Sequence, residues 1–289
     1  MTAITAENSS RFADTARGRI HYNEAGEGPV VIMLHGSGPG ATGWSNFSPN
    51  IGPLAERYRI ILMDFPGWGQ SDALDSSGEH LLVALADAVK ALMDTLGIDR
   101  AALVGNSLGG MAAQLFASLH ADRITHLITM GAPAPAGPPQ FFSPGGISEG
   151  LRTLFEAYHA PTLENFRRLV GIMVFDPAFI TDRLVAQRRE GAVANPQHLQ
   201  NFPRNAGAMP SLNAPEIARL GDALAMIATP ALIIHGRDDR VINVENSLRV
   251  AAIIPNSTLL VFNRCGHWAQ LEHAAAFNRQ VDAFIAAHG

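Results

Sequence analysis

Hydrophobic residues along the chain gather in six short runs that are separated by longer amphipathic stretches. Each run has five to seven mostly aliphatic residues, and the runs span 30–34, 59–64, 101–105, 124–130, 231–236 and 257–262. Because these runs show little alternation with polar residues, they predict strands that are buried on both faces, as in a parallel sheet.

Helical patterns lie between several of these runs. The first has apolar residues at a spacing of 3.6 and stops at Gly97; its members are Leu82, Leu85, Ala86, Val89, Leu92, Met93 and Leu96. A second helix is predicted after Ser107 through Phe116, and a last one around Phe277 and Val281. The alternation of strands and helices predicts an α/β protein with a mostly parallel central sheet flanked by helices.

The alternation stops after Met130. Residues 131–146 are rich in Pro and Gly, and the chain from there to about Leu224 has helical periodicity without a convincing buried strand. We therefore predict a core domain made of residues 1–131 and 225–289, with residues 132–224 inserted as a helical lid over the carboxyl edge of the sheet.

Composition excludes several classes of protein. The 289 residues are 47% hydrophobic, and the formal charge of −5 leaves no basic patch for nucleic acid. The single cysteine, Cys265, allows no intrachain disulfide and fits a reducing compartment. The start of the chain lacks a secretory pattern, and no apolar run approaches the length of about 18 residues that suggests a membrane span. These features predict a soluble cytoplasmic protein that binds neither nucleic acid nor a membrane.

A nucleophilic serine is predicted where the third run meets the second helix. Gly105-Asn-Ser107-Leu-Gly109 matches G-x-S-x-G, in which a tight turn between strand and helix presents the serine hydroxyl. A serine nucleophile needs a histidine base and a carboxylate that orients it. His267 follows the last strand-like run, and two aspartates follow the run before it, so the chain order is Ser, Asp, His.

The two aspartates, Asp238 and Asp239, are adjacent, so only one of them can point toward His267. We favour Asp239 as the orienting carboxylate. Asp238 is then expected to pair with Arg237 or Arg240, or to cap the loop.

The glycine-rich stretch after the first run admits two interpretations. Gly38 to Gly43 matches G-x-G-x-x-G, the dinucleotide fingerprint, and Asp64 lies where a ribose-binding carboxylate would follow. However, three residues separate the fingerprint from the strand, and Pro39 removes an N–H from the phosphate cradle. We favour an oxyanion hole instead, formed by the backbone N–H groups of Ser37 and Leu108.

Together these motifs resemble the α/β-hydrolase superfamily and, within it, the meta-cleavage product hydrolases, which cleave C–C bonds during aromatic-ring degradation. The resemblance runs from about Gly18 to the end of the chain. It is carried by the segments LHGSGPGATGWSNF (34–47), DFPGWGQSD (64–72), GNSLGGM (105–111), GRDDR (236–240) and CGHWAQLEHAAAFNR (265–279).

The resemblance implies a 2-hydroxy-6-oxo-hexa-2,4-dienoate substrate cleaved between C5 and C6, giving 2-hydroxypenta-2,4-dienoate and a carboxylic acid. It implies that Arg188 binds the carboxylate of the substrate and that Asn106 and Trp268 lie beside it. It further implies no cofactor and a homo-oligomer, either a dimer or a larger assembly. The eleven histidines show no H-E-x-x-H or similar ligand spacing, so no metal is expected. The remaining residues expected at the substrate are Gly36, Gly38, Met173 and Phe175.

Several points stay open. Met173 stands where several relatives carry an aromatic residue, so the C6 substituent is not assigned. The apolar lid residues Phe141, Phe142, Ile147 and Leu154 fit either a pocket lining or the lid core. A carboxylesterase or lactonase uses the same three catalytic residues, and a ligand receptor on an inactive hydrolase fold is a further alternative. The choice between an acyl-enzyme and a gem-diol mechanism is also open.

Overall fold

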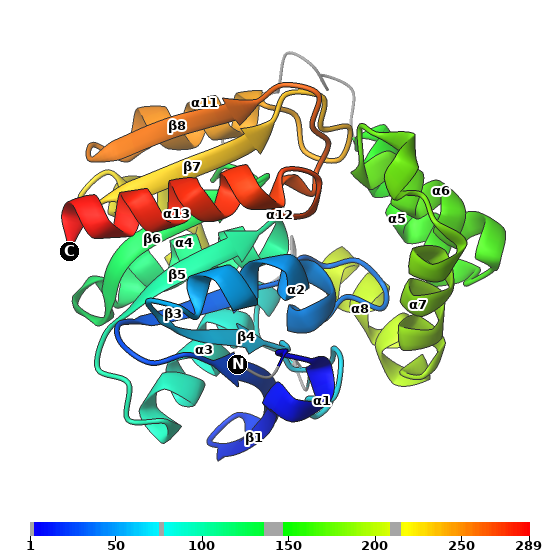
Figure 1. Ribbon diagram of the computed structural model, residues 1–289, viewed down its shortest axis with the longest axis horizontal. Coiled ribbons are helices and arrows are strands. Elements are labelled where there is room, and N and C mark those ends of the chain that lie inside the picture. The colour runs from blue at the N-terminus through cyan, green and yellow to red at the C-terminus, as the bar shows by residue number, and fades with distance from the viewer. Residues whose placement is uncertain (1–2, 75–77, 136–146, 209–214) are drawn as a thin grey trace.

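A single central sheet organises the part of the chain that the computed structural model describes, residues 3–74, 78–135, 147–208 and 215–289 (Figure 1). Its strands are β1 (Ser10–Thr15), β2 (Gly18–Ala25), β3 (Val30–Leu34), β4 (Arg59–Met63), β5 (Ala101–Asn106), β6 (Ile124–Met130), β7 (Ala231–Gly236) and β8 (Ser257–Phe262). Their order is β1-β2-β4-β3-β5-β6-β7-β8, and all pairs from β4 to β8 are parallel.

The six apolar runs coincide with β3 to β8, which confirms the predicted parallel sheet. The sequence pattern missed the antiparallel strands β1 and β2 at one edge. Both strands carry charged residues such as Arg11 and Arg19, and β1 is largely exposed. The edge strand β1 needs no continuous apolar run, and in β2 the buried residues Ile20 and Tyr22 alternate with the buried polar residues His21 and Asn23, so this pair gave no signal.

Helices cover both faces of the sheet. One face is covered by α3 (Leu81–Thr95), α4 (Leu108–Leu119) and α11 (Glu245–Ile253), and the other by α2 (Gly43–Leu54), α12 (Ala269–Glu272) and α13 (Ala274–His288). Alternate side chains of β3 enter the two cores: Ile32 contributes to the first and Met33 to the second. A short helix, α1 (Ala6–Ser9), precedes β1, and a 3-10 turn (Ala121–Arg123) precedes β6.

Helix α2 was not predicted, because it contains Pro49 and Pro53. Proline lacks the N–H that would bond the carbonyl four residues earlier, so the carbonyls of Ser45 and Pro49 have no partner within the helix. Each is used by another segment. The Arg188 guanidinium donates to the Ser45 carbonyl at 3.1 Å, and the Asn278 amide donates to the Pro49 carbonyl at 3.3 Å.

The described residues between β6 and β7 are helical, as predicted for this segment. They form α5 (Glu149–His159), α6 (Leu163–Met173), α7 (Asp182–Val193), α8 (Pro196–Ala208), α9 (Pro215–Ala218) and α10 (Leu220–Leu224), with a 3-10 turn at Pro177–Phe179. Figure 1 shows α5, α6 and α7 beside the carboxyl end of the sheet. The division into a core and a lid domain stays a prediction. None of the described helices is both long and apolar enough to cross a membrane.

Candidate active site

Ser107 occupies a strained turn between β5 and α4. Its φ of 53° and ψ of −116° are unusual for a residue with a side chain. The Ser107 N–H donates to the Met130 carbonyl at 2.8 Å, which ties the turn to the end of β6. A Cβ atom on Gly109 would lie 2.2 Å from the Leu34 carbonyl oxygen, so only glycine allows α4 to begin this close to β3. The turn therefore presents the serine at the carboxyl edge of the sheet.

His267 and Asp239 come from the loops after β8 and β7 and meet beneath this edge. The Nδ1 atom of His267 lies 2.6 Å from Oδ2 of Asp239, and both side chains are buried. The other carboxylate oxygen accepts the N–H groups of Val241 and Ile242 at 2.7 and 3.0 Å. Burial alone would raise the pKa of Asp239, but His267 and the hydrogen bonds from histidine side chains hold it well below its usual range. The carboxylate is thus charged when it orients the imidazole.

Asp238 has a different environment. It contacts the Arg237 guanidinium at 3.2 Å, as expected from the sequence, and accepts the Cys265 N–H. Of the two adjacent aspartates, Asp239 is the one that the structure brings to His267.

Both expected oxyanion donors lie at the same edge. Ser37 follows β3 and Leu108 opens α4, and in the part of the chain that the structure describes neither N–H donates to another protein group. His35 holds the peptide between Gly36 and Ser37, because its Nδ1–H donates to the Gly36 carbonyl at 2.8 Å. Its Nε2 accepts the Phe65 N–H at 3.0 Å. Since burial lowers the pKa of His35, the ring stays neutral in this arrangement.

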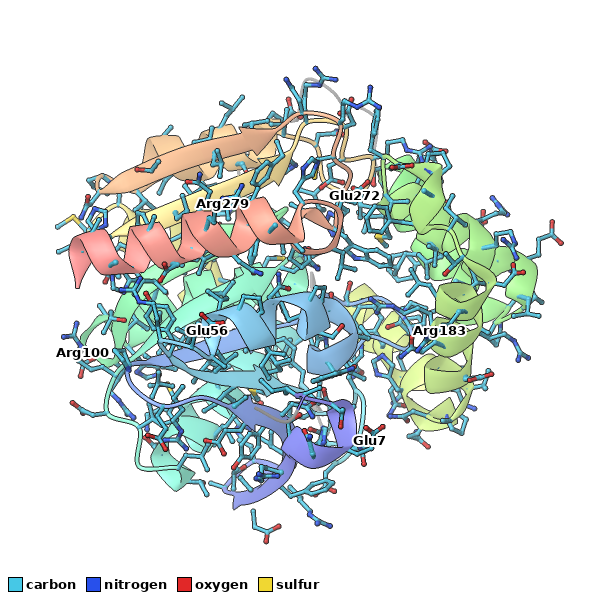
Figure 2. The ribbon with its side chains drawn as sticks, in the orientation of Figure 1. Glu7, Glu56, Arg100, Arg183, Glu272 and Arg279 are labelled. Atoms are coloured by element: carbon cyan, nitrogen blue, oxygen red, sulfur yellow. The ribbon has the colours of Figure 1, made fainter. Side chains whose placement is uncertain are left out.

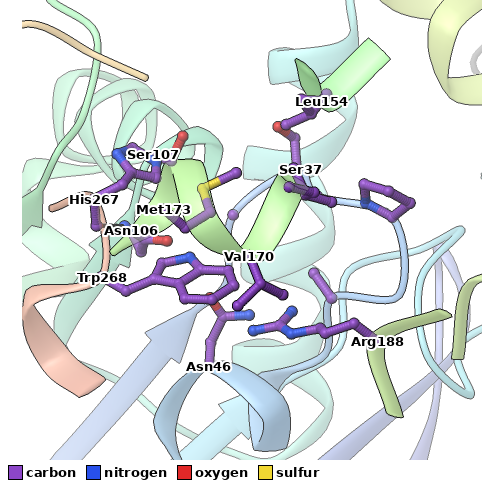
Figure 3. Close-up of a pocket in the computed structure, with 15 residues that line it drawn as sticks. Ser37, Asn46, Asn106, Ser107, Leu154, Val170, Met173, Arg188, His267 and Trp268 are labelled. Atoms are coloured by element: carbon purple, nitrogen blue, oxygen red, sulfur yellow. Dashed lines mark hydrogen bonds between the residues drawn. The ribbon is translucent and has the colours of Figure 1, made fainter. Parts of the chain in front are cut away.

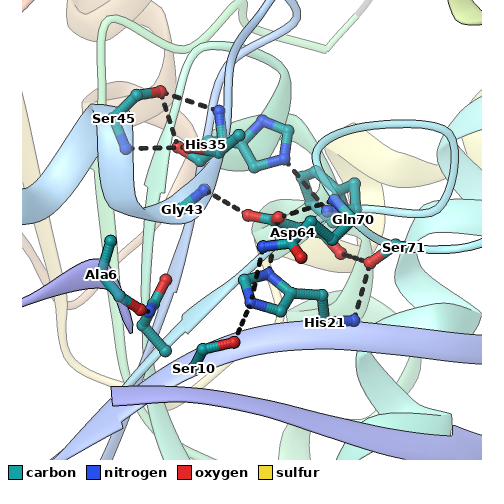
Figure 4. A network of polar contacts seen from close by, with 12 residues as sticks. Ala6, Ser10, His21, His35, Gly43, Ser45, Asp64, Gln70 and Ser71 are labelled. Carbon is teal, nitrogen blue, oxygen red and sulfur yellow. Dashed lines mark hydrogen bonds and ion pairs between the residues drawn. The ribbon is translucent and has the colours of Figure 1, made fainter. Parts of the chain in front are cut away.

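The glycine-rich loop contacts the helix that carries Arg188. Gly40 has a φ of +70°, and a Cβ atom there would lie 2.0 Å from the Arg188 carbonyl oxygen. Asp64, the alternative ribose ligand, is buried: it accepts the Gly43 N–H at 2.7 Å and contacts His21 at 2.8 Å (Figure 4). Asp64 therefore stabilises the start of α2, which argues against the dinucleotide interpretation.

One pocket collects most of the predicted residues (Figure 3). Ser107 and His267 both line this active-site pocket. Its lining comprises Gly36, Ser37, Gly38, Pro39, Ala41, Asn46, Asn106, Ser107, Leu154, Leu169, Val170, Met173, Arg188, His267 and Trp268.

Arg188 supplies the positive charge of the pocket. It is only 3% exposed, and none of the described residues bonds its Nε atom. Its Nη2 donates to the Ser45 carbonyl, and its guanidinium lies 4.7 Å from the centre of the Trp268 ring. Burial lowers the pKa of Arg188 to about 10, so the side chain remains charged near neutral pH. Among the described residues no carboxylate pairs with this buried cation, which is an unusual feature and fits an anionic ligand.

Asn106 supplies a complementary acceptor. Its Nδ2 donates to the carbonyls of Met130 and His267 at 3.2 and 3.4 Å. Its Oδ1 is buried and has no hydrogen-bond partner in the described part of the chain. The pocket thus offers a free cationic donor and a free neutral acceptor, a combination suited to a carboxylate with a nearby hydroxyl group.

Some predicted residues lie elsewhere. Phe175 does not line the pocket: it is 37% exposed, and the Arg264 guanidinium lies over its ring at 5.2 Å. Ile147 is 52% exposed, whereas Leu154 and Met173 do line the pocket. Phe141 and Phe142 lie outside the described residues.

Sequence reasoning missed Asn46, Leu169 and Val170. Leu169 and Val170 belong to the apolar face of α6, whose 3.6-residue periodicity was visible but did not distinguish a pocket wall from lid packing. Asn46 gave no signal because α2 itself was not predicted.

Comparisons with known proteins agree with this geometry. The family model described as alpha/beta hydrolase fold matches residues 29–274. The chain belongs to the α/β-hydrolase family. Within it, the chain groups with the meta-cleavage product hydrolases: a solved structure of that name from Pseudomonas fluorescens superposes with a TM-score of 0.84 at 30% identity, over 96% of this chain and 98% of the other.

Two curated relatives are more similar in sequence. A 2-hydroxy-6-oxo-6-phenylhexa-2,4-dienoate hydrolase from Burkholderia cepacia is 44% identical over 99% of both chains. A 2-hydroxy-6-oxononadienedioate/2-hydroxy-6-oxononatrienedioate hydrolase from Cupriavidus pinatubonensis is 42% identical over 98% of this chain and 97% of that protein. The resemblance predicted from the sequence motifs is thereby confirmed.

Proposed function

We propose that this protein hydrolyses the C5–C6 bond of a 2-hydroxy-6-oxo-hexa-2,4-dienoate with Ser107, His267 and Asp239 as catalytic residues. The observation that carries the proposal is the buried Arg188 guanidinium, whose Nε is unpartnered in the same pocket as Ser107. An ester or lactone could be cleaved without this cation. A dienoate has a carboxylate that needs it.

The pocket supports a division of roles along the substrate. Arg188 binds the C1 carboxylate, and the free Oδ1 of Asn106 accepts a hydrogen bond from the 2-hydroxyl group. The C6 carbonyl then lies at Ser107, where the N–H groups of Ser37 and Leu108 stabilise negative charge on its oxygen. Trp268 provides an aromatic face for the guanidinium.

The chemistry requires a proton at C5 before the bond breaks, because a simple vinyl carbanion is a poor leaving group. Ketonisation of the dienol places that proton, and the C5 fragment then leaves as a dienolate stabilised by its 2-oxo group. His267 is the base for the attack of Ser107 or water on C6 and the candidate for proton transfer to C5. Overall, water supplies the hydroxyl group of the new acid and the proton on the departing fragment.

The test compares two adjacent arginines. Arg189 donates through its Nε to the Pro161 carbonyl and does not line the pocket. Arg188→Met should lower kcat/KM for a dienoate at least about thirtyfold, because an anionic group loses its buried charge partner. Arg189→Met should leave it near the wild-type value. Substrate loss is followed by the decay of its visible absorbance.

A carboxylesterase or lactonase is the alternative. A p-nitrophenyl ester has no carboxylate for Arg188, so its hydrolysis should be weak in the wild type. Two results together would show that the C–C hydrolase proposal is wrong. The wild type would cleave the p-nitrophenyl ester faster than the dienoate, and Arg188→Met would leave the rate of ester cleavage unchanged.

We also propose that residues 132–224 act as a lid, that the protein works in the cytoplasm, and that it forms a homo-oligomer. The helical composition of the described part of that segment supports the first, and the single buried Cys265 is compatible with the second. Light scattering of the purified protein tests the third: a monomeric mass would contradict it.

A further inference from the structure

The active-site pocket contains a single permanent cation. Among the described residues that line it, Arg188 is the only lysine or arginine, and His267 is the proposed base. A substrate with one carboxylate uses this charge fully. A substrate with two carboxylates would leave the second without a cationic partner.

We propose that the group on C6 of the substrate is uncharged and apolar, an aryl or alkyl group, and that the protein discriminates against a carboxylate at that end. This inference rests on the proposed function and concerns the specificity of the same site. It matters because the two curated relatives differ on this point: one is named for a 6-phenyl substrate and the other for a dioate.

The wall contributed by α5 and α6 is apolar. Leu154 comes from α5, and Leu169, Val170 and Met173 come from α6; all four are buried and line the pocket. In the view of Figure 3, Leu154 and Arg188 lie on opposite sides of Ser37. A substrate whose carboxylate contacts Arg188 and whose C6 lies at Ser107 therefore extends its C6 group away from the guanidinium.

The buried histidines close to this pocket cannot replace a second cation. Burial lowers the pKa of both His35 and His198, the latter to about 3, so both rings are neutral near pH 7. His35 is committed to the Gly36 carbonyl, and the Nε2 of His198 lies 2.9 Å from the Tyr158 hydroxyl.

Arg168 of α6 and Arg240, in the loop after β7, have partners at the surface. Arg168 pairs with Glu156 at 2.9 Å, and both side chains are about half exposed. Arg240 donates to the Gly171 carbonyl at 2.7 Å. The stretches 136–146 and 209–214, outside the described residues, contain no Lys, Arg or His in their sequence, so they hold no further cationic side chain.

The expected selectivity follows from desolvation. An apolar group gains free energy when it leaves water for this wall, whereas a carboxylate loses its hydration there without gaining a charge partner. An enzyme discriminates far more strongly against a substrate that leaves a buried polar group unpaired than against one that differs by a single methylene group. We expect kcat/KM for a 6-phenyl or 6-isopropyl dienoate to exceed that for 2-hydroxy-6-oxononadienedioate by about a hundredfold or more.

The first experiment measures kcat/KM of the wild-type protein for these three substrates. A hundredfold preference for the phenyl or isopropyl compound supports the inference. Equal or faster cleavage of the dioate overturns it while leaving the proposed function intact. Failure to cleave any of the three would instead overturn the proposed function.

A second experiment changes the wall. Leu154→Lys introduces a cation, and Leu154→Met, of similar length and neutral, is the matched control. The lysine variant should raise kcat/KM for the dioate relative to the methionine variant by about tenfold or more, as expected for a new buried charge pair. Thermal unfolding of both variants establishes that they are folded. If the folded lysine variant gives no gain, the wall at Leu154 does not bound the C6 group, and this assignment is wrong.

Discussion

The carboxylate of Asp239 has no free oxygen, since one accepts two backbone N–H groups and the other contacts His267. Asp239→Asn would keep the volume but place an amide N–H₂ against at least one of these donors. Because the imidazole would lose its tautomer and orientation, we expect kcat to fall by about 10⁴-fold. The measurement is kcat, taken as the turnover rate at a saturating concentration of the dienoate.

Asp238→Asn is the matched control for this variant, since Asp238 contacts Arg237 at the surface. It should retain activity within a few fold of the wild type. A larger loss in Asp238→Asn than in Asp239→Asn would reverse the assignment of the orienting carboxylate.

At the scale of single residues, the sequence predicted well those residues whose place follows from the direction of the strands. Ser107, Asp239 and His267 follow the ends of the parallel strands β5, β7 and β8, so their meeting could be predicted. The free Oδ1 of Asn106 and the free Nε of Arg188 could not, because an unpartnered atom is defined by everything packed around it. Phe175 illustrates the same limit: two residues from Met173, it faces Arg264 and not the pocket.

At the scale of helices and strands, α2 positions Arg188 through a backbone carbonyl that lacks its usual hydrogen bond within the helix. Pro49 cannot donate to the Ser45 carbonyl, and the guanidinium takes its place. Pro49→Ala would supply an N–H that competes for this carbonyl. We expect KM for the dienoate to rise about two- to tenfold, the range of one hydrogen bond, with little change in kcat.

Pro53→Ala is the control for this helix, because the carbonyl that Pro53 leaves free is bonded by Asn278, away from the pocket. Its KM should match the wild type. An equal rise in KM for both variants would show that helix α2 as a whole, and not the Ser45 carbonyl, sets the position of Arg188.

A second element-level prediction concerns the junction between α6 and the loop that carries His267 (Figure 2). Glu272 accepts the Phe175 and Asp176 N–H groups with one oxygen, at 2.7 and 2.9 Å, and the Gly266 N–H with the other, at 2.6 Å. The Met173 carbonyl also accepts the His267 N–H at 2.7 Å. This carboxylate therefore ties the base to the pocket wall.

Glu272→Gln should disrupt one side of this junction, because an amide has one acceptor oxygen and would oppose an N–H with its own N–H₂. We expect kcat to fall about tenfold or more, with a smaller change in KM, since a displaced base affects chemistry more than binding. Steady-state kinetics of the folded variant provide the measurement. Unchanged kcat would mean that the Met173 carbonyl alone positions His267.

Individual strands and helices could be predicted from the sequence where both faces of the sheet are buried. Strands β3 to β8 gave continuous apolar runs because helices cover both faces, and α3 gave a clear stripe. The β1–β2 hairpin and α2 were missed for different reasons. In the hairpin β1 is largely exposed, and the buried centre of β2 includes the polar residues His21 and Asn23, so neither strand has a continuous apolar run; α2 contains two prolines whose lost hydrogen bonds are replaced by partners far away in sequence.

At the scale of the whole molecule, the helical segment and the sheet meet through a buried polar chain. The Tyr158 hydroxyl of α5 donates to the Ser37 carbonyl at 2.6 Å, next to the expected oxyanion donor. With that proton committed, His198 of α8 donates its Nε2–H to the Tyr158 oxygen at 2.9 Å. The Trp68 ring packs against His198 at 4.2 Å between centres. This chain requires a proton on Nε2 of His198, and burial keeps the ring otherwise neutral near pH 7 by lowering its pKa.

Burial lowers the pKa of His198 from 6.5 to about 3 in the folded protein. Between these two values the unfolded chain binds a proton that the folded protein does not, so acid favours unfolding and stability increases with pH across this range. His198 should contribute up to about 1.4 kcal/mol per pH unit, and His35, whose pKa is also lowered by burial, adds a slope of the same sign. Above about pH 6.5 the contribution of His198 should be constant.

His198→Gln isolates this contribution, because its amide can donate to Tyr158 but does not titrate. We expect urea unfolding of the wild type at pH 5 to give a lower free energy than at pH 7, and the glutamine variant to show a smaller difference between the two values. The slope that remains in the variant includes the contributions of His35 and His126, whose pKa values burial also lowers. If the variant and the wild type lose stability equally between pH 7 and pH 5, proton uptake by His198 does not couple the helical segment to the sheet, and the acid sensitivity arises elsewhere in the core.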